Sequence, residues 1–219
     1  TPAPWAMLPP MITDPAVEDY LRTLLPPRDL VLQEIEARAR RERIPIVGPL
    51  VGTVLFQLAS LVRARKIFEF GSAIGYSTIW LARAAGPKGR VFYTESNPDR
   101  VRDAMGYCRR AGVLARVTFL MGDALEGFRK TSGVFDLAFN DVDKAGYPAV
   151  WKAASARIRP GGLFLSDNTL WSGRVAQTKK DAWTRAIHRM NLAVAKDHRF
   201  VSSLLPLRDG LTVAWRKGP

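Results

Sequence analysis

The chain has 219 residues, of which 47% are hydrophobic and 24% charged, so it can form a domain with a sizeable core and is too apolar to be disordered. A formal charge of +13 suggests a nucleic acid, an anionic membrane surface or an acidic ligand as a partner. One cysteine excludes an internal disulfide framework, and the lack of a membrane-length apolar run or charged leader favours a cytoplasmic protein.

The first 45 residues have the features of an N-terminal appendage. Four prolines within residues 1–12 predict an irregular arm, because proline cannot donate the backbone hydrogen bonds of regular elements. An Asp-Pro pair predicts the start of a short helix over residues 14–25. Amphipathic spacing predicts a second helix over residues 29–44, and a third helical pattern covers residues 51–61.

From residue 66 onward, short β-rich runs alternate with helical stretches. Strands are expected at residues 66–70, 90–95, 116–121, 135–140 and 162–166, and helices at 77–85, 98–111, 124–130, 147–158 and 181–197. This alternation predicts parallel βαβ units with helices on both faces of a sheet. Asp209-Gly210 between two apolar runs predicts a closing hairpin over residues 200–217. We therefore expect one α/β domain over residues 46–219, with residues 1–45 as its appendage.

Three signals at predicted strand ends point to a nucleotide-like ligand. Gly71 and Gly75 form a turn that opens a helix, where a backbone can approach a ligand closely and an anion is attracted. The turn departs from G-x-G-x-x-G at Ala73, which disfavours a nicotinamide dinucleotide. Glu95 could bind both hydroxyls of a ribose or be a solvated strand-end carboxylate. Asp123 could bind an adenine amino group or cap the following helix.

The most specific signal lies at two further strand ends. Asp141 closes one predicted strand, and Asp167-Asn168 closes the next. Adjacent parallel strands bring such ends together, and carboxylate and amide oxygens suit a hard divalent cation. Lys144 could then act as a general base on a bound hydroxyl. The alternative interpretation is that the acids cap helices and the lysine is solvated.

These segments resemble the cation-dependent O-methyltransferases that use S-adenosylmethionine, the catechol and caffeoyl-coenzyme A O-methyltransferase group. The resemblance spans residues 47–215 and is carried by EFGSAIGYS (69–77), GDAL (122–125), FDLAFNDVDK (135–144), GGLFLSDNTLWSGRV (161–175) and PLRDGL (206–211). It implies a Rossmann-like class I methyltransferase fold, with a seven-stranded, mostly parallel sheet whose last strand is antiparallel.

The resemblance also implies the roles of individual residues. Lys144 would be the catalytic base, and Asp141, Asp167 and Asn168 would bind a divalent cation such as Mg²⁺, Mn²⁺ or Ca²⁺. S-adenosylmethionine would contact Val47, Glu69, Gly71, Ser77, Glu95, Asp123, Ala124 and Asp141. Many relatives are homodimers, so a homodimer is expected here as well. Asn140 departs from the family pattern, in which this position is usually apolar.

The expected activity is divalent-cation-dependent transfer of a methyl group to a hydroxyl of a small catechol-like or phenolic acceptor. The aromatic side chains that could line the binding site of such an acceptor, or instead belong to the core, are Trp171, Tyr147 and Trp151. One alternative is a transfer RNA (hydroxyuridine-type) O-methyltransferase of the same fold, which the basic charge would suit. However, no stripe of interleaved basic and aromatic residues is present to stack bases. The other alternative is a non-catalytic nucleotide-binding module. No membrane association is expected.

Overall fold

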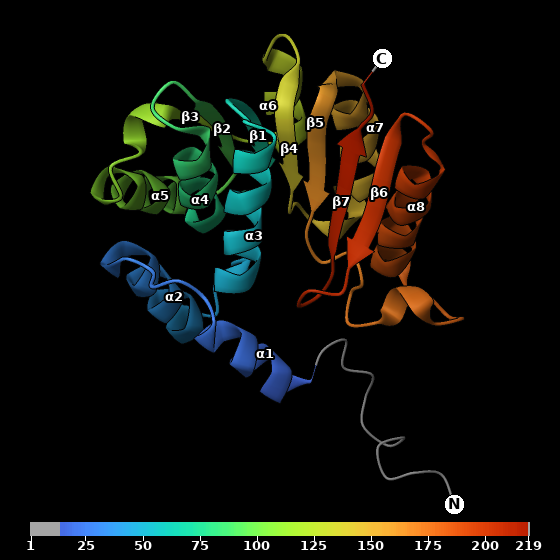
Figure 1. Cartoon of the computed structure of the whole chain (residues 1–219), viewed down its shortest axis with the longest axis horizontal. Helices are drawn as coiled ribbons and strands as arrows, with labels where there is room; N and C mark the ends of the chain where they lie inside the picture. Colours follow the sequence, from blue (N-terminus) through green and yellow to red (C-terminus); the bar gives the residue numbers. More distant parts are fainter. Residues whose placement is uncertain (1–13, 219) are drawn as a thin grey trace, which may run out of the picture.

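Seven strands form one sheet at the centre of the computed structural model, which describes residues 14–218 (Figure 1). Their order is β3-β2-β1-β4-β5-β7-β6. The strands are β1 (Lys66–Phe70), β2 (Arg90–Glu95), β3 (Val117–Met121), β4 (Phe135–Asn140), β5 (Ile158–Ser166), β6 (Phe200–Leu205) and β7 (Leu211–Arg216). Strands β1 to β5 pair in parallel, whereas β7 is antiparallel to both β5 and β6. The predicted seven-stranded sheet with an antiparallel last strand is therefore confirmed.

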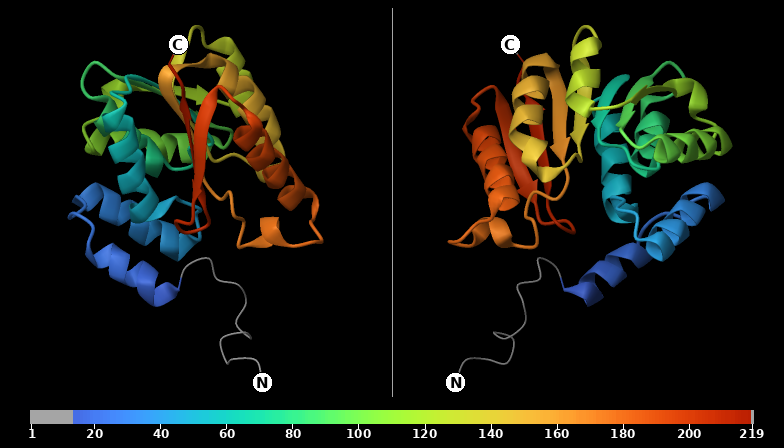
Figure 2. Two further views of the ribbon diagram at one scale, coloured as in Figure 1. Left: turned by 45° about the vertical axis from the view of Figure 1, so that its right-hand side comes forward. Right: turned by 180° about the vertical axis from the view of Figure 1, so that it is seen from behind.

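Helices cover both faces of this sheet, as the views in Figure 2 show. They are α1 (Pro15–Thr23), α2 (Leu30–Glu42), α3 (Gly48–Leu61), α4 (Tyr76–Ala85), α5 (Pro98–Arg110), α6 (Ala124–Lys130), α7 (Tyr147–Arg157) and α8 (Ala182–Lys196), with short 3-10 turns at η2 (Leu114–Arg116), η3 (Lys144–Gly146) and η4 (Arg174–Ala176). Successive side chains along each strand point to opposite faces of the sheet and so pack into two separate cores. Ile67 packs into the core under α3, α4 and α5, and Phe68 packs into the core under α6, α7 and α8.

The two N-terminal helices differ in how they join this body. Helix α1 begins as predicted, with the Asp14 carboxylate accepting a hydrogen bond from the backbone N–H of Ala16, yet none of its residues is buried. Helix α2 contributes Leu32 and Ile35 to the core under α3 and α4. The predicted irregular arm lies outside the described residues, and the division of the chain at residue 45 stays a prediction.

Two elements begin three or four residues earlier than their sequence patterns predict. Helix α3 starts at Gly48, because the left-handed φ of 70° at this glycine turns the chain and Pro49 fits the first helical turn. Strand β5 starts at Ile158, because an irregularity between the Phe135 and Leu137 pairings accommodates the Pro-Gly-Gly run within the strand. Among the described helices, none is long and apolar enough to cross a membrane.

Candidate active site

The tips of β1, β4 and β5 meet at one edge of the sheet, where they bring the predicted acidic residues together. The backbone N–H of Asp141 donates to the carbonyl of Phe70 at 2.8 Å, and that of Asp167 donates to the carbonyl of Asn140 at 3.1 Å. Gly71 fits closely against this junction, since a Cβ at its position would lie 2.6 Å from the carbonyl oxygen of Asp141. Its φ of 78° also favours glycine. The glycine turn and the acidic strand ends therefore belong to one site.

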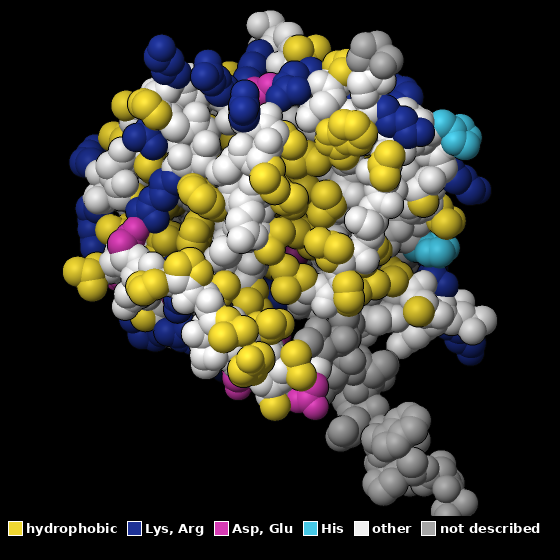
Figure 3. Space-filling model, in the orientation of Figure 1, with side chains coloured by type: hydrophobic (Ala, Val, Ile, Leu, Met, Phe, Trp, Pro, Cys, Tyr) yellow, Lys and Arg dark blue, Asp and Glu magenta, His cyan; other side chains and the backbone are white. Residues whose placement is uncertain are grey.

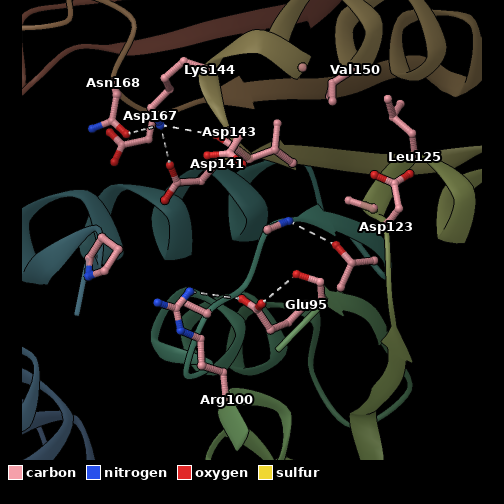
Figure 4. Close-up of a pocket in the computed structure, with 18 of the residues that line it drawn as sticks. Glu95, Arg100, Asp123, Leu125, Asp141, Asp143, Lys144, Val150, Asp167 and Asn168 are labelled. Carbon is pink, nitrogen blue, oxygen red and sulfur yellow. Dashed lines mark hydrogen bonds and ion pairs between the residues drawn. The ribbon is translucent and has the colours of Figure 1, made fainter. Parts of the chain in front are cut away.

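The Lys144 ammonium lies at the centre of the polar groups on this edge (Figure 4). Its Nζ is 3.2 Å from Asp141 Oδ1, 2.7 Å from Asn168 Oδ1 and 2.7 Å from the Tyr147 hydroxyl. Tyr147 in turn donates to the Asp167 carbonyl at 2.9 Å. The hydroxyl of this buried tyrosine thus links the lysine to the β5 tip, so Tyr147 supports the lysine from the core side and does not line the cavity.

Burial dominates the electrostatics of the two aspartates. It raises the pKa of Asp141, and the positive charge of Lys144 opposes that rise. Burial also raises the pKa of Asp167, and the nearby charge of Asp141 adds to the effect. Asp167 Oδ1 is buried without a hydrogen-bond partner among the described residues. The arrangement therefore holds two mutually repelling carboxylates in a site that favours a cation.

A cavity of about 760 Å³ extends from these residues to the tips of β2 and β3. Glu95 lines its far side, accepts a hydrogen bond from the backbone N–H of Asn97 at 2.8 Å, and lies 3.8 Å from Arg100. Asp123 lines the same side and caps α6 by accepting from the Glu126 N–H at 2.8 Å, so the predicted capping role is confirmed. Figure 4 shows Glu95 and Asp123 across the cavity from Lys144.

The predicted site residues divide into two groups by position. Those that line the cavity are Gly71, Glu95, Asp123, Ala124, Asp141, Lys144, Asp167 and Asn168. Val47, Glu69 and Ser77 are buried behind its wall. Burial raises the pKa of Glu69 to about 7, although the nearby hydroxyl groups of Ser77, Thr78 and Ser72 favour its charged form.

Several residues that line the cavity were not predicted from the sequence. Arg208 enters from the turn between β6 and β7, and Arg100 enters from α5. Trp183, at the start of α8, is 55% exposed and meets Trp171 edge-on with 6.2 Å between ring centroids. Of these, only Arg208 carried a signal in the sequence, the turn in which it lies.

The structure also shows which of the aromatic candidates line the cavity and where Asn140 lies. Trp171 lines the cavity, whereas Trp151 packs in the core against Phe164 and Phe200. The buried Asn140 side chain donates to Ser166 Oγ at 2.9 Å and so joins β4 to β5 immediately before their acidic tips.

Known proteins resemble both the sequence and the fold of this chain. A model of the O-methyltransferase family matches residues 30–217. A catechol O-methyltransferase from Mycobacterium tuberculosis is 35% identical over 80% of this chain and 81% of its own length. A caffeoyl-CoA O-methyltransferase from Petroselinum crispum is 32% identical, over 75% of this chain and 74% of its own. The structure of an O-methyltransferase from Bacillus cereus in complex with SAH superimposes with a TM-score of 0.84, at 31% identity over 92% of this chain and 97% of that one. The chain therefore belongs to the O-methyltransferase family of enzymes.

Proposed function

We propose that this enzyme transfers the methyl group of S-adenosylmethionine to a hydroxyl of a small catechol-like or phenolic acceptor, with the help of a divalent cation. The observation that carries the proposal is the convergence of Asp141, Asp167, Asn168 and Lys144 on one end of a cavity whose other end holds Glu95 and Asp123. The relatives named for catechol and caffeoyl-CoA support the acceptor class, and the SAH complex supports the methyl donor.

The oxygens at the β4 and β5 tips fit a hard divalent cation. Among the described residues, no group of three or more His, Cys, Asp or Glu side chains could hold a metal. The proposed ligands at the β4 and β5 tips are therefore two carboxylates and one amide. Asp141 and Asn168 each present an oxygen to the Lys144 ammonium, and Asp167 Oδ1 is buried without a partner. Mg²⁺, with Mn²⁺ or Ca²⁺ as alternatives, would be held by these three residues and would supply the Lewis acidity that lowers the pKa of an acceptor hydroxyl.

The remaining steps belong to the side chains of the chain itself. In its neutral amine form, Lys144 accepts the proton of the acceptor hydroxyl and becomes an ammonium, and Tyr147 holds its Nζ on the cavity side of β4. Glu95 binds the ribose hydroxyls, Asp123 and Ala124 bind the adenine, and Gly71 allows close approach of the methionine part. Rate acceleration would come largely from holding the oxygen and the methyl group close together and in line.

Labelled S-adenosylmethionine, offered with a panel of catechols and with transfer RNA, tests this proposal. We expect methyl transfer to a catechol that is lost in chelator and restored by Mg²⁺. Asp141→Asn and Asp167→Asn should lower turnover about 10³-fold, because several kcal/mol of charge stabilisation are lost. Lys144→Ala should also lose turnover but keep Mn²⁺ binding in titration calorimetry. Full activity of either aspartate variant in chelator would overturn the cation assignment.

The transfer RNA alternative depends on where the basic side chains lie. Figure 3 shows many Lys and Arg side chains along the upper edge of this view, which is the edge at which the parallel strands begin. Lys66 and Arg90, for example, are the first residues of β1 and β2. The cavity opens at the opposite edge of the sheet, so these cations are poorly placed to guide RNA to it. Transfer to RNA but not to catechols would reverse this preference.

Homodimerisation, a cytoplasmic location and a methyltransferase domain over residues 46–219 complete the proposal. Exposed apolar side chains on α1 and at its C-cap, including Tyr20 at 62% and Leu24 at 62%, support a protein contact at this helix. Sedimentation of the full chain tests the dimer.

A further inference from the structure

The turn between β6 and β7 lies between two segments that shape the cavity. Figures 1 and 2 show this turn at the lower end of the sheet, beside the start of α3 and the loop that follows β5. Gly210 closes the turn by donating to the Leu207 carbonyl at 2.9 Å, and its φ is 91°. The sequence predicts this turn as part of a closing hairpin and indicates no role for it at the cavity. Its contacts reach both ends of the proposed reaction site.

Arg208 binds the segment that precedes α3. Its Nη1 donates to the carbonyl of Ile46 at 3.2 Å and to the carbonyl of Val47. Its Nε also lies 3.9 Å from Glu18 of α1. A Cβ at Gly48 would lie 3.2 Å from the same Nη1, so the guanidinium packs directly against this backbone. Ile46 lines the cavity, and Arg208 therefore fixes the cavity wall on the side of the predicted methyl-donor site.

Asp209 and Gly210 bind the loop that follows β5. The Asp209 carboxylate accepts a hydrogen bond from the Ser172 N–H, and its carbonyl accepts from the Leu170 N–H at 2.9 Å. The Gly210 carbonyl accepts from the Thr169 N–H at 3.0 Å. This loop carries Trp171, which lines the cavity on the proposed acceptor side.

The loop needs such support because its backbone is strained. Asn168, Trp171 and Ser172 have φ values of 54°, 49° and 51°. For residues with a Cβ, the left-handed conformation is disfavoured and persists only when neighbouring contacts enforce it. The bonds from Asp209 supply that enforcement at the two residues next to Trp171.

We propose that Arg208 and Asp209 are positioning residues that act on opposite sides of the cavity. Arg208 sets the methyl-donor side through residues 46 and 47, and Asp209 sets the acceptor and cation side through Leu170 and Ser172, in the loop that follows Asn168. One turn thereby fixes the two substrates of the proposed reaction relative to each other. The inference rests on the proposed function for the names of those substrates, but the division into two sides rests on the hydrogen bonds alone.

Binding measurements on matched variants test this division. Arg208→Ala should weaken S-adenosylmethionine and SAH about tenfold in titration calorimetry without weakening Mn²⁺, since a charged donor to two carbonyls is lost. Asp209→Ala should weaken Mn²⁺ and raise the KM for a catechol, each about tenfold, while donor affinity stays within about twofold. Asp209→Asn keeps an acceptor for the Ser172 N–H, so it should recover most of the wild-type values.

The other end of the same hairpin provides the control. Asp197 and Arg199 form an ion pair at 2.7 Å just before β6, and neither lines the cavity. Arg199→Ala should leave the donor affinity, the Mn²⁺ affinity and the KM for a catechol unchanged. The proposal is overturned if Arg208→Ala and Asp209→Ala move donor and cation affinity equally, or if both only lower the melting temperature. If the wild type methylates no catechol, the proposed function fails, while donor and Mn²⁺ affinities still decide the positioning roles.

Discussion

Replacement of Glu69 by Gln should make the protein more stable at neutral and higher pH. Glu69 is fully buried on β1, where its Oε2 accepts a hydrogen bond from Thr78 and its Oε1 has no partner among the described residues. Gln keeps the shape and the acceptor and removes the charge. It can also donate an N–H to the surrounding hydroxyl groups.

The pKa of Glu69 gives the size and sign of the effect. Burial raises this pKa from 4.5 to about 7. Below pH 4.5 the carboxyl is protonated in both the folded and the unfolded chain, so its contribution to stability is fully present. That contribution is lost as the pH rises through the folded pKa, and the full loss amounts to about 3 kcal/mol. The advantage of Gln over Glu should therefore grow by about 2 kcal/mol between pH 5 and pH 8.

Urea unfolding of wild type and Glu69→Gln at a series of pH values measures this advantage. Glu126→Gln on the exposed surface of α6 is the control, and its difference from wild type should stay nearly constant with pH. At pH 8 the melting temperature of Glu69→Gln should be a few degrees higher than that of wild type, up to about 10 °C. A variant less stable than wild type at pH 8, or an advantage that does not change with pH, would refute the reasoning from burial.

Three further changes probe the packing and the cavity mouth. Tyr76→Phe removes a 2.7 Å hydrogen bond to the buried Glu36 and should lower the free energy of unfolding by about 2 kcal/mol. Tyr20→Phe, on the exposed face of α1, should leave the free energy of unfolding unchanged. Equal losses in the two variants would contradict this account. Gly210→Ala places a Cβ 2.6 Å from the Leu170 nitrogen at a φ of 91° and should cost more than about 2 kcal/mol in calorimetry. Gly112 has a φ of 70° but open space around it, so Gly112→Ala should lower the free energy of unfolding clearly less than Gly210→Ala. Equal losses would show that steric contact at Gly210 is unimportant. Trp183→Ala should raise the KM for a catechol several-fold with a stability change of no more than about 0.5 kcal/mol, and an unchanged KM would remove Trp183 from the acceptor site.

The parts of the fold that the sequence predicts well are those decided by local patterns. The expected bounds of β1, β2, β4 and α6 agree with the structure residue for residue. Each has a clear apolar run or a capping residue such as Asp123, and these act over a few neighbours. The bulge in β5 was not predictable in this way, because pairing with β4 decides whether a Pro-Gly-Gly run ends a strand or distorts it.

The same distinction applies to the site. Asp141 and Asp167 were predictable because strand ends in a parallel sheet share one edge, and the structure brings both to the cavity. Arg208 was not, because its contacts are with backbone carbonyls 161 and 162 residues away in the chain. Backbone acceptors carry no signature of residue type, so such a contact leaves no pattern in the sequence. Trp183 resembled any exposed aromatic residue on an amphipathic helix.

The distribution of charge gives a physical reason for the ligands that we propose. Among the residues that the structure describes, five carboxylates and three cationic side chains line the cavity, namely Glu95, Asp123, Asp141, Asp143 and Asp167 against Arg100, Lys144 and Arg208. A chain with a net charge of +13 thus has a cavity in which acids outnumber bases. Such a cavity would attract the proposed divalent cation and the sulfonium group of S-adenosylmethionine. Methyl transfer removes the sulfonium charge, so the product SAH is attracted less strongly than the donor. The acidic cavity in a basic protein would therefore favour donor binding and product release together.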